Sequence, residues 1–499
     1  MIDIKDIRSD PQRFTEAAKA KGFDVDIERL LEIDEQLRKI KSKLQHIATE
    51  KNRLGKLIPQ LEDEYERGIR IGTLGSHKRR EGELQEQIKA FQPEFDELML
   101  LVAQPPDESV PFGEDDTQNV EIRKWGEIRQ FDFEPKDHVQ LGLDLDIIDI
   151  ERGVKLAGTR NYFLKGDGAL LHWAILRFAM DSMIEKGYVP LTVPMLVRDE
   201  VMMGTGFFPG SEDQTYRMEK DSLNLAGTAE VPLTAYHKGE LLTQDRLPLK
   251  YVALSTCFRR EAGAAGKDTH GLYRIHQFDK VEQVVIGQND EEQSKAYHRE
   301  ILANAEEVMQ ALELPYRVVN VCTGDLGRGQ VQKYDIEAWM PSRDSYGETH
   351  SASRFYEFQA RRMNLRYKTA QKKNVFCHTL NNTVIASPRI LIPILELNQN
   401  PDGSVNIPKP LQQYMSGKEI IVVGMGKQVA PPTDTLTKNE IKILREFAKG
   451  KSNKEIAIDL RRSVRTVEDR RQRLMHRFGA KNTDDLVKKA ARTGFTVED

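Results

Sequence analysis

The chain has 499 residues, of which 39% are hydrophobic and 30% are charged, and its formal net charge is −4. This length allows several domains, and the composition is typical of folded soluble proteins rather than of disordered or fibrous ones. No stretch approaches the roughly 18 uninterrupted apolar residues that a membrane span needs, and no signal peptide follows Met1, so we expect a cytoplasmic protein without a membrane partner. The three cysteines are widely separated, which argues against a disulfide framework and against a structural zinc site.

The charge is unevenly distributed along the chain. Residues 436–499 carry 17 Lys and Arg against 10 Asp and Glu, whereas residues 1–435 carry 57 against 68. A basic C-terminal segment on an acidic body suggests a polyanionic partner for that segment. A solvated basic surface explains the charge alone equally well.

The first predicted element is a long helical hairpin near the N-terminus. Apolar residues recur at alternating spacings of three and four over 30–61 and again over 84–102, which predicts two helices that pack along a heptad seam. The glycine-bearing segment 67–77 is expected to form the turn of this antiparallel coiled coil, and Pro59 and Pro93 should fray or bend it. The heptads alone do not distinguish a dimerisation rod from an RNA-binding arm, because Lys-rich flanks occur in both.

A large mixed region follows a linker at 103–116 that is rich in Pro and acidic residues. Helical periodicity over 169–186 is followed by β-rich runs that come one after another. These runs are 250–258, 273–285, 316–322 and 331–340. Consecutive strands favour an antiparallel sheet of α+β type over βαβ winding.

The C-terminal residues 436–492 form a compact helical pattern. Thr437, Ser452 and Thr483 are predicted to cap three of its helices at their N-termini, and Gly450 is predicted to end the first. This pattern predicts a separate all-α domain.

The most informative segment for function is CFRREAGAAGKDTHGLYRIHQFDKVEQ, at 257–283. It is predicted to form a strand, a Gly/Ala-rich loop and a returning strand, in which alternate side chains share a face. Arginines bind phosphates, an aromatic ring stacks on a purine, and a glutamate accepts hydrogen bonds from an ammonium or hydroxyl group. A nucleotide beside a small polar substrate fits such a face, whereas a salt-bridged structural sheet is the alternative for any single residue. Five side chains are expected together on this face: Arg259, Glu261, Arg274, Phe278 and Glu282.

This segment resembles the second signature motif of the class II aminoacyl-tRNA synthetases, which has the form FRxE, a loop, and a returning strand that ends in an arginine and an aromatic residue. Over roughly residues 1–425 the chain resembles the seryl-tRNA synthetase family of bacterial type. Its third motif keeps the Asn, Thr and Arg positions but departs from the glycine-richer form NGSGLAVGR. The other segments that carry the resemblance are TAEVPL (228–233), ETHSAS (348–353), FQARRMNLRY (358–367) and HTLNNTVIASPR (378–389).

The resemblance implies an ATP site with Mg²⁺. Arg259 would hold the α-phosphate, Glu261 the adenine edge and Arg274 the γ-phosphate. Phe278 and Arg389 would stack on the two sides of the base, and Arg259, Glu261 and Arg389 are implied as the catalytic residues. The complete implied ATP site is Arg259, Arg260, Glu261, Arg274, Phe278, Glu348, Thr349, His350, Ser351 and Arg389.

The resemblance also implies a magnesium site and a serine pocket. Glu348 and Ser351 would bind magnesium near the α- and β-phosphates, where the ion neutralises charge on the leaving pyrophosphate. Glu282 and Thr383 are the candidates for holding the serine hydroxyl, because a site built to hydrogen-bond a hydroxyl strongly rejects an analogue that lacks it. The implied serine pocket is Thr228, Ala229, Glu230, Glu282, Asn381 and Thr383.

The implied architecture is α+β in three domains. An antiparallel coiled-coil arm with its linker occupies 1–116, and a class II catalytic domain, whose antiparallel sheet is flanked by helices, occupies 117–429. An all-α helix-turn-helix domain occupies 430–499. The segment 169–186 resembles the first class II motif, which implies a homodimer. Within the family, the arm grips the long variable arm of serine tRNA, and selenocysteine tRNA is a further substrate that the resemblance allows.

The C-terminal segment 436–490 resembles the LuxR-type helix-turn-helix of bacterial response regulators. Its second helix is expected at 453–460 and its recognition helix at 464–478. A helical bundle that contacts protein is the alternative to DNA binding. The recognition helix would present to a major groove the arginines Arg465, Arg470, Arg471, Arg473 and Arg477.

Two other functions are compatible with parts of the sequence. A regulator could sense serine or ATP and signal to a DNA-binding tail without charging tRNA, but the complete set of charged motif residues counts against it. A ligase that loads a carrier protein is the second alternative, but such relatives lack the tRNA arm that this chain possesses.

Overall fold

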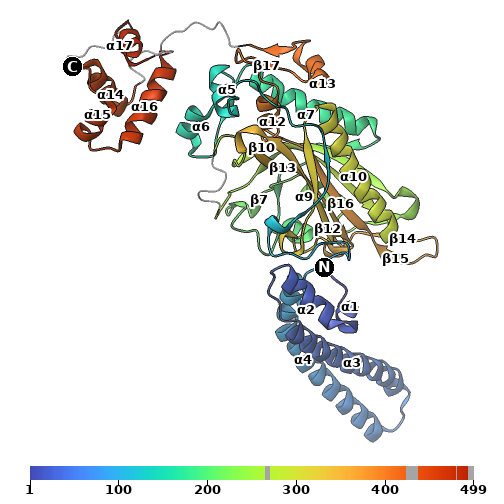
Figure 1. Cartoon of the computed structure of the whole chain (residues 1–499). Coiled ribbons are helices and arrows are strands. Elements are labelled where there is room, and N and C mark those ends of the chain that lie inside the picture. The colour runs from blue at the N-terminus through green and yellow to red at the C-terminus, as the bar shows by residue number, and fades with distance from the viewer. Residues whose placement is uncertain (264–269, 423–435, 479, 481, 493–499) are drawn as a thin grey trace. The chain divides into compact units, whose positions relative to one another are not determined.

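The computed structural model describes residues 1–263, 270–422, 436–478, 480 and 482–492 (Figure 1). Contacts divide the chain into two compact units, Met1–Val422 and Val423–Asp499. The predicted domain boundary between 429 and 430 lies outside the described residues, and the boundary at 116 stays a prediction. Within the part of the chain that the structure describes, no helix is long and apolar enough to cross a membrane.

The N-terminal part of the first unit is a helical hairpin, as the heptads predicted. Its long helices pack side by side (Figure 1), with Ile40, Ile47 and Leu84 in a shared apolar cluster. Across the pair, the Lys51 Nζ lies 2.6 Å from the Glu81 Oε2. The helices of this region are α1 (Ile4–Ser9), α2 (Pro11–Ala20), α3 (Ile27–Leu57) and α4 (Glu64–Leu101).

The turn of the hairpin lies earlier than predicted. The segment 67–77 is helical within α4, and the chain reverses at a 3-10 turn, η1 (Ile58–Gln60), and the residues that follow it. Pro59 lies in this turn, where its missing N–H prevents α3 from continuing. The Asp63 carboxylate then caps α4 by accepting a hydrogen bond from the Tyr65 N–H at 2.8 Å. The predicted position of the turn was therefore wrong, because Pro59 and the Asp63 cap set the turn while the glycines of 67–77 fit within α4. Pro93 also lies inside α4.

An antiparallel-rich sheet forms the centre of the first unit, which confirms the predicted α+β class. The strand order is β1-β11-β12-β13-β16-β10-β9-β4, and only β4 pairs in parallel with its neighbour among these described strands. The strands are β1 (Val120–Trp125), β4 (Val189–Pro190), β9 (Leu249–Phe258), β10 (Gln277–Gly287), β11 (Tyr316–Asn320), β12 (Gln332–Met340), β13 (Ser345–Tyr356) and β16 (His378–Ser387).

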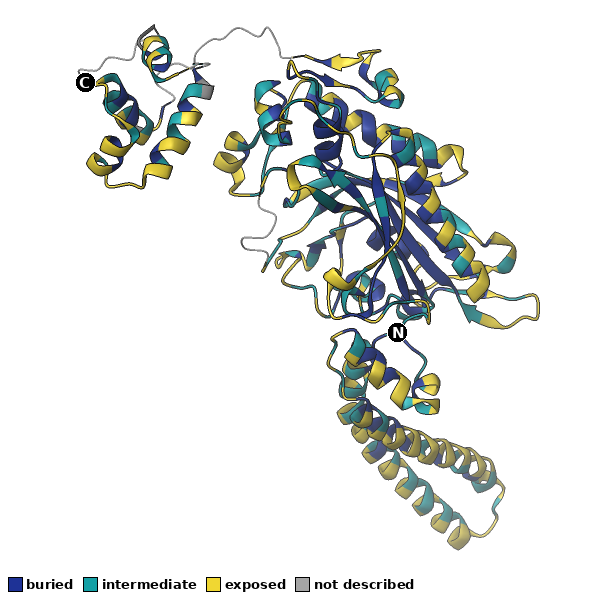
Figure 2. Cartoon of the chain, in the orientation of Figure 1, coloured by how far each residue is buried: buried dark blue, intermediate teal, exposed yellow. Residues whose placement is uncertain are grey.

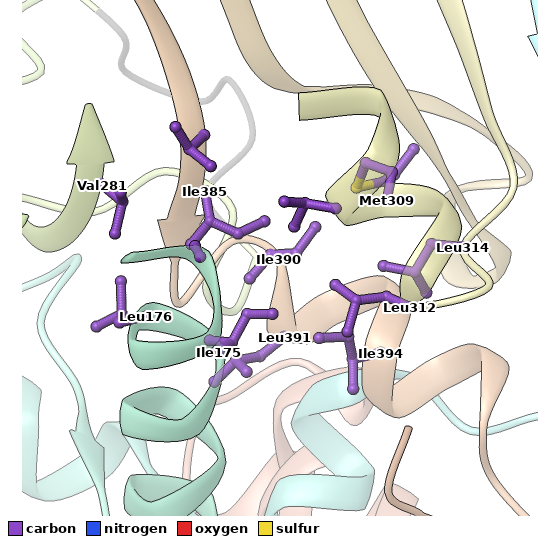
Figure 3. Close-up of a cluster of buried hydrophobic side chains, with 14 of the residues drawn as sticks. Ile175, Leu176, Val281, Met309, Leu312, Leu314, Ile385, Ile390, Leu391 and Ile394 are labelled. Carbon is purple, nitrogen blue, oxygen red and sulfur yellow. The ribbon is translucent and has the colours of Figure 1, made fainter. Parts of the chain in front are cut away.

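Helices cover both faces of this sheet. The largest apolar cluster joins helices to strand residues such as Val281 and Ile385, and Figure 3 shows Ile175, Met309 and Ile394 converging there. The helices that build this cluster are α5 (His138–Asp144), α7 (Asp167–Glu185), α10 (Glu291–Ala311), α12 (Leu391–Leu397) and α13 (Lys409–Gln412). A second apolar cluster contains the β10 residues Val284 and Ile286, together with residues of α9 (Glu230–Ala235) and α11 (Phe358–Met363). Figure 2 shows the strands buried and the outward helix faces exposed.

Smaller elements complete this unit. The base of the hairpin packs on the rest of this unit through an apolar cluster that joins Leu30 and Met99 to Phe355 and Phe358. The remaining helices and 3-10 turns are η2 (Asp116–Gln118), α6 (Ile150–Ala157), α8 (Asp199–Thr205), η3 (Gln244–Arg246), η4 (Thr323–Asp325), η5 (Pro341–Arg343) and η6 (Gln413–Met415). The remaining strands are β2 (Ile148–Asp149), β3 (Phe163–Leu164), β5 (Leu196–Val197), β6 (Tyr216–Met218), β7 (Leu223–Leu225), β8 (Leu241–Thr243), β14 (Arg366–Lys368), β15 (Asn374–Phe376), β17 (Val405–Asn406) and β18 (Ile420–Ile421).

The described residues of the second unit form helices without strands, as predicted. Its core gathers apolar side chains that include Leu444, Ile456 and Leu474. Thr437 and Ser452 each form the predicted cap with a glutamate three residues later, whereas Asn482 rather than Thr483 caps the last helix. The helices are α14 (Lys438–Ala448), α15 (Asn453–Asp459), α16 (Val464–Arg477) and α17 (Thr483–Arg492).

Candidate active site

A cavity of about 240 Å³ lies in the first unit, between the ends of β9 and β10 and the strands β13 and β16. Most of the residues expected for ATP and serine line this one cavity. They are Thr228, Glu230, Arg259, Glu261, Phe278, Glu282, Glu348, Thr349, Ser351, Asn381, Thr383 and Arg389. The arrangement can therefore hold a charged ligand against several cations and carboxylates at once.

Four expected site residues do not line the cavity. Ala229 is buried in the second apolar cluster, with Leu233 of α9, and Arg260 is exposed. Arg274 lies beside the cavity and forms an ion pair with Glu261 through its Nε. His350 points away, because it lies between Thr349 and Ser351, which face the cavity. Its Nδ1 forms a hydrogen bond with the Thr349 hydroxyl at 2.8 Å. Burial lowers the pKa of His350 to about 4, so this ring is neutral.

The charged side chains of the motif do not come together through strand alternation, as had been predicted. β9 ends at Phe258 and β10 begins at Gln277, so the predicted strand at 273–285 starts too early. Arg259 and Glu261 therefore follow the first strand instead of lying in it, and Glu261 has a left-handed backbone, with φ of 52°. This turn brings Glu261 back toward the cavity. The predicted Gly/Ala-rich loop falls partly on 264–269, outside the described residues.

The deep end of the cavity contains a buried ion pair that the motif analysis missed. The Lys280 Nζ lies 2.5 Å from the Glu282 Oε2, and both side chains are almost fully buried. The Thr383 hydroxyl donates to the same Glu282 oxygen at 3.3 Å. Lys280 could have been found from strand alternation, because it lies between Phe278 and Glu282 at a spacing of two.

Glu230 is a second buried carboxylate at this end. Its Oε1 accepts a hydrogen bond from the Gln359 Nε2 at 2.8 Å. Burial, followed by the nearby charge of Glu282, raises the pKa of Glu230 to about 7. Perturbed carboxyl groups in a cavity are typical of functional sites, so this one is suited to bind a cationic group.

The outer end of the cavity carries arginines over aromatic rings. The Arg259 guanidinium lies 5.2 Å from the Phe278 ring centroid, and the Arg389 guanidinium lies 4.5 Å from that of Tyr273. Arg389 also donates to the backbone carbonyls of Tyr273 and Glu348, each at 2.9 Å. Desolvation alone would raise the pKa of the Glu348 carboxyl, but neighbouring cations, first among them Arg389, hold it below its ordinary value. Tyr273 lines the cavity but was not predicted.

Three known families match successive parts of the chain. The "Seryl-tRNA synthetase N-terminal domain" matches residues 1–104, and the "tRNA synthetase class II core domain (G, H, P, S and T)" matches residues 214–398. The family "Bacterial regulatory proteins, luxR family" matches residues 434–490.

Relatives and solved structures extend these matches. The serine–tRNA ligase of Deinococcus radiodurans is 44% identical over 428 residues, which are 84% of this chain and 99% of that protein. That of Fervidobacterium nodosum is 42% identical over 426 residues, again 84% and 99%. The crystal structure of seryl-tRNA synthetase from Pyrococcus horikoshii complexed with ATP has a TM-score of 0.78 at 37% identity and covers 85% of this chain and 99% of that chain. The crystal structure of the cytoplasmic serine–tRNA ligase from Naegleria fowleri in complex with AMP has a TM-score of 0.74 at 31% identity. It covers 83% of this chain and 96% of that chain. Since such relatives are matched over nearly their whole length, the chain belongs to the serine–tRNA ligase family of class II aminoacyl-tRNA synthetases.

Proposed function

We propose that this serine–tRNA ligase binds its two small substrates at opposite ends of the cavity described above. The supporting observation is that the buried carboxylates Glu230 and Glu282 line one end, whereas the exposed Arg259 and the half-buried Arg389 line the other. Near-full-length relatives favour this ligase over a serine-sensing regulator that does not charge tRNA.

The deep end is the proposed serine pocket. Glu230 accepts the substrate ammonium group, because a buried carboxylate is stabilised by a cation that replaces its proton. Glu282 and Thr383 bind the serine hydroxyl, and Lys280 forms an ion pair with Glu282 beside it. Thr228 and Asn381 complete the wall. Alanine lacks the hydroxyl and leaves one hydrogen-bonding position of this pocket unfilled, which is the basis of its rejection.

The outer end is the proposed nucleotide site. Arg259 binds the α-phosphate and Phe278 and Arg389 flank the adenine ring, while Glu261 accepts a hydrogen bond from the adenine edge. Arg274 is proposed to bind the γ-phosphate, which requires it to exchange its ion pair with Glu261 for the phosphate. A serine carboxylate oxygen attacks the α-phosphorus, pyrophosphate leaves, and the ribose hydroxyl at the tRNA 3′ end then attacks the seryl carbonyl and releases AMP. The side chains contribute by orientation and by stabilising negative charge.

The residues at the cavity wall fit a magnesium ion that arrives with ATP. Glu348 supplies a carboxylate and Ser351 a hydroxyl, and Mg²⁺ prefers such oxygen donors. Across the described residues, no group of three or more His, Cys, Asp and Glu side chains is placed to hold a metal by itself, so phosphate oxygens would have to supply the other ligands. The bound ion would neutralise charge on the phosphates.

We further propose a homodimer that uses the face around α7. Trp173 is 63% exposed on this helix, and Val189 and Leu254 are exposed on the neighbouring strands β4 and β9. Large apolar side chains grouped on one face indicate a protein interface.

The helical arm is proposed to bind serine tRNA. Lys78, Arg79 and Arg80 are exposed on α4, and cations on an exposed helix can bind the phosphate backbone. The family match over residues 1–104 supports this assignment.

DNA binding by the second unit is a separate proposal, favoured by the luxR-family match. Arg465 and Arg473 are exposed on α16, and Arg470 and Arg471 are half-buried on the same helix. The side chain of Arg477 lies outside the described residues. A helix of this kind can enter a major groove with its arginines on phosphates and base edges.

Charging of serine tRNA tests these proposals together. The full chain and a truncated chain ending at Val422 are compared for seryl-tRNA formation, and the second unit is tested for a sequence-selective shift of duplex DNA. Equal charging by both chains places the second unit outside catalysis. Absence of charging by both would refute the ligase assignment.

A further inference from the structure

We propose that the buried pair formed by His138 and Glu396 positions the nucleotide end of the cavity. This inference rests on the role proposed above for Arg389 in binding ATP. Neither residue lines the cavity. They lie in two short helices, α5 and α12, that are far apart in the sequence and are joined by the hydrogen bond between the two side chains.

Glu396 joins three segments of the chain. Its Oε1 accepts a hydrogen bond from the backbone N–H of His138 at 3.0 Å and lies 2.7 Å from the His138 Nδ1. Its Oε2 accepts from the backbone N–H of Ser342 at 2.9 Å. A fully buried carboxylate is costly unless its oxygens are hydrogen-bonded, so these contacts fix the start of α5 and the turn η5 against α12.

The first route to the cavity runs through the other nitrogen of His138. Because Nδ1 faces a carboxylate, the network assigns the proton to Nδ1 and leaves Nε2 as an acceptor. The His138 Nε2 accepts the Leu272 N–H at 3.2 Å, and Leu272 lines the cavity. Gly271 makes this approach possible, because a Cβ there would lie 1.9 Å from the His138 Nε2. The preceding His270 is held by Asp137 at 3.0 Å, so residues 270–272 are fixed to the start of α5.

The second route runs through Arg343, the residue after Ser342. The Arg343 guanidinium lies 4.2 Å from the Tyr273 ring centroid, and the Arg389 guanidinium lies 4.5 Å from the same centroid. The Tyr273 carbonyl also accepts from the Arg389 Nε at 2.9 Å. Both routes from Glu396 therefore converge on Leu272 and Tyr273, and through them on Arg389.

The serine end of the cavity is built from other contacts. Its side chains lie on β10, β16 and the start of α9, and the ion pair of Lys280 with Glu282 lies within β10. Loss of the His138 contacts should therefore weaken the use of ATP more than the use of serine. A merely structural role would affect both substrates alike.

Two substitutions at His138 separate its two hydrogen bonds. In H138N the amide can still donate toward Glu396, but no acceptor reaches the Leu272 N–H. In H138Q the longer side chain can place its oxygen near the position of Nε2. In serine-dependent pyrophosphate exchange, we expect H138N to raise the KM for ATP by about tenfold or more and to leave the KM for serine within about twofold, because small displacements of binding groups are costly. H138Q should recover most of the loss.

His237 offers a matched control. It is also buried, with its Nδ1 2.9 Å from Glu240 and its Nε2 2.8 Å from the Tyr251 hydroxyl, but these contacts do not involve residues 271–273. H237N should lower the unfolding temperature without changing the KM for ATP. R343A changes an exposed side chain and folds even if H138N does not, and it should raise the KM for ATP by about threefold through loss of its contact with Tyr273.

R389A distinguishes failure of this inference from failure of the nucleotide site. If R389A leaves the KM for ATP unchanged, the proposed ATP site is wrong. If R389A raises it while H138N and R343A do not, or if H138N raises both KM values equally, the positioning role is overturned. A selective rise for ATP with rescue by H138Q supports it.

Discussion

The catalytic cavity and the C-terminal helical unit both concentrate charge, but they do so in different ways. The cavity collects charged side chains from segments between Thr228 and Arg389, and several of them are buried and paired. On α16 the arginines lie on successive turns of one helix, and Arg465 and Arg473 face solvent. Buried charges interact strongly and depend on each other, whereas exposed charges act nearly independently. Single substitutions should have large effects in the cavity, where the side chains act together on the substrates, and modest ones on α16.

The largest effect is expected for R259A. Arg259 is the proposed contact of the α-phosphate, and loss of one such donor costs about a hundred- to a thousandfold in rate. Serine-dependent pyrophosphate exchange measures this loss as kcat/KM. The control is R299A, which removes an exposed guanidinium from α10 and should leave exchange unchanged. Exchange by R259A at more than a third of the unmodified rate would contradict the assignment.

A smaller effect is expected from pH, through Glu230. Burial and the charge of Glu282 raise the pKa of Glu230 to about 7, and only the ionised form binds the serine ammonium. The kcat/KM for serine should therefore fall about tenfold for each pH unit below 7, since this ratio reports the free enzyme. The E230Q variant should lose this acid limb along with most of its serine affinity, while the kcat/KM for ATP should show no matching limb.

The same group makes a prediction for stability without serine. The folded protein holds the Glu230 proton more tightly than the unfolded chain, whose carboxyl titrates near about pH 4.3. The free energy of unfolding should therefore fall as the pH rises from about 4.3 to about 7. Denaturant titrations of the unmodified chain and of E230Q measure this slope, and equal slopes would show that Glu230 is not desolvated.

A single substitution on α16 should have a smaller effect on function than one in the cavity. R473A removes one exposed cation and should weaken binding of duplex DNA by about tenfold, the scale of one arginine contact. Pyrophosphate exchange should not change. A loss of exchange in R473A would show that the second unit contributes to catalysis and would remove the contrast between the two regions.

The smallest effect is expected for removal of the second unit. A chain ending at Val422 keeps the whole cavity, so its kcat for seryl-tRNA formation should stay within about twofold of the full chain, as expected where two units act independently. Its KM for tRNA should rise in low salt only if the basic unit adds nonspecific affinity for phosphates. Measuring the KM for tRNA of the two chains at low and high salt tests this contribution.

The sequence predicted the elements whose periodicity is local. The heptads located α3 and α4, and the capping signals at Thr437 and Ser452 located α14 and α15. The turn of the hairpin was missed because its glycines fit within α4, while Pro59 ends α3. Local patterns thus specify elements better than the places where they end.

The site was predicted through motifs, and its supporting contacts were not. Motif positions identified Arg259, Glu282 and Arg389, all of which line the cavity. The contact between His138 and Glu396 joins residues 258 positions apart, so only the folded chain brings them together. Burial lowers the pKa of His350 to about 4 and makes its ring neutral, although its motif position placed it in the implied ATP site.

Serine-dependent exchange of labelled pyrophosphate into ATP tests the central claim most directly, because it requires both ends of the cavity to act on one intermediate. The account predicts exchange with serine, none without an amino acid and none above background with alanine. Exchange that is absent with serine, or equal with alanine, would contradict it.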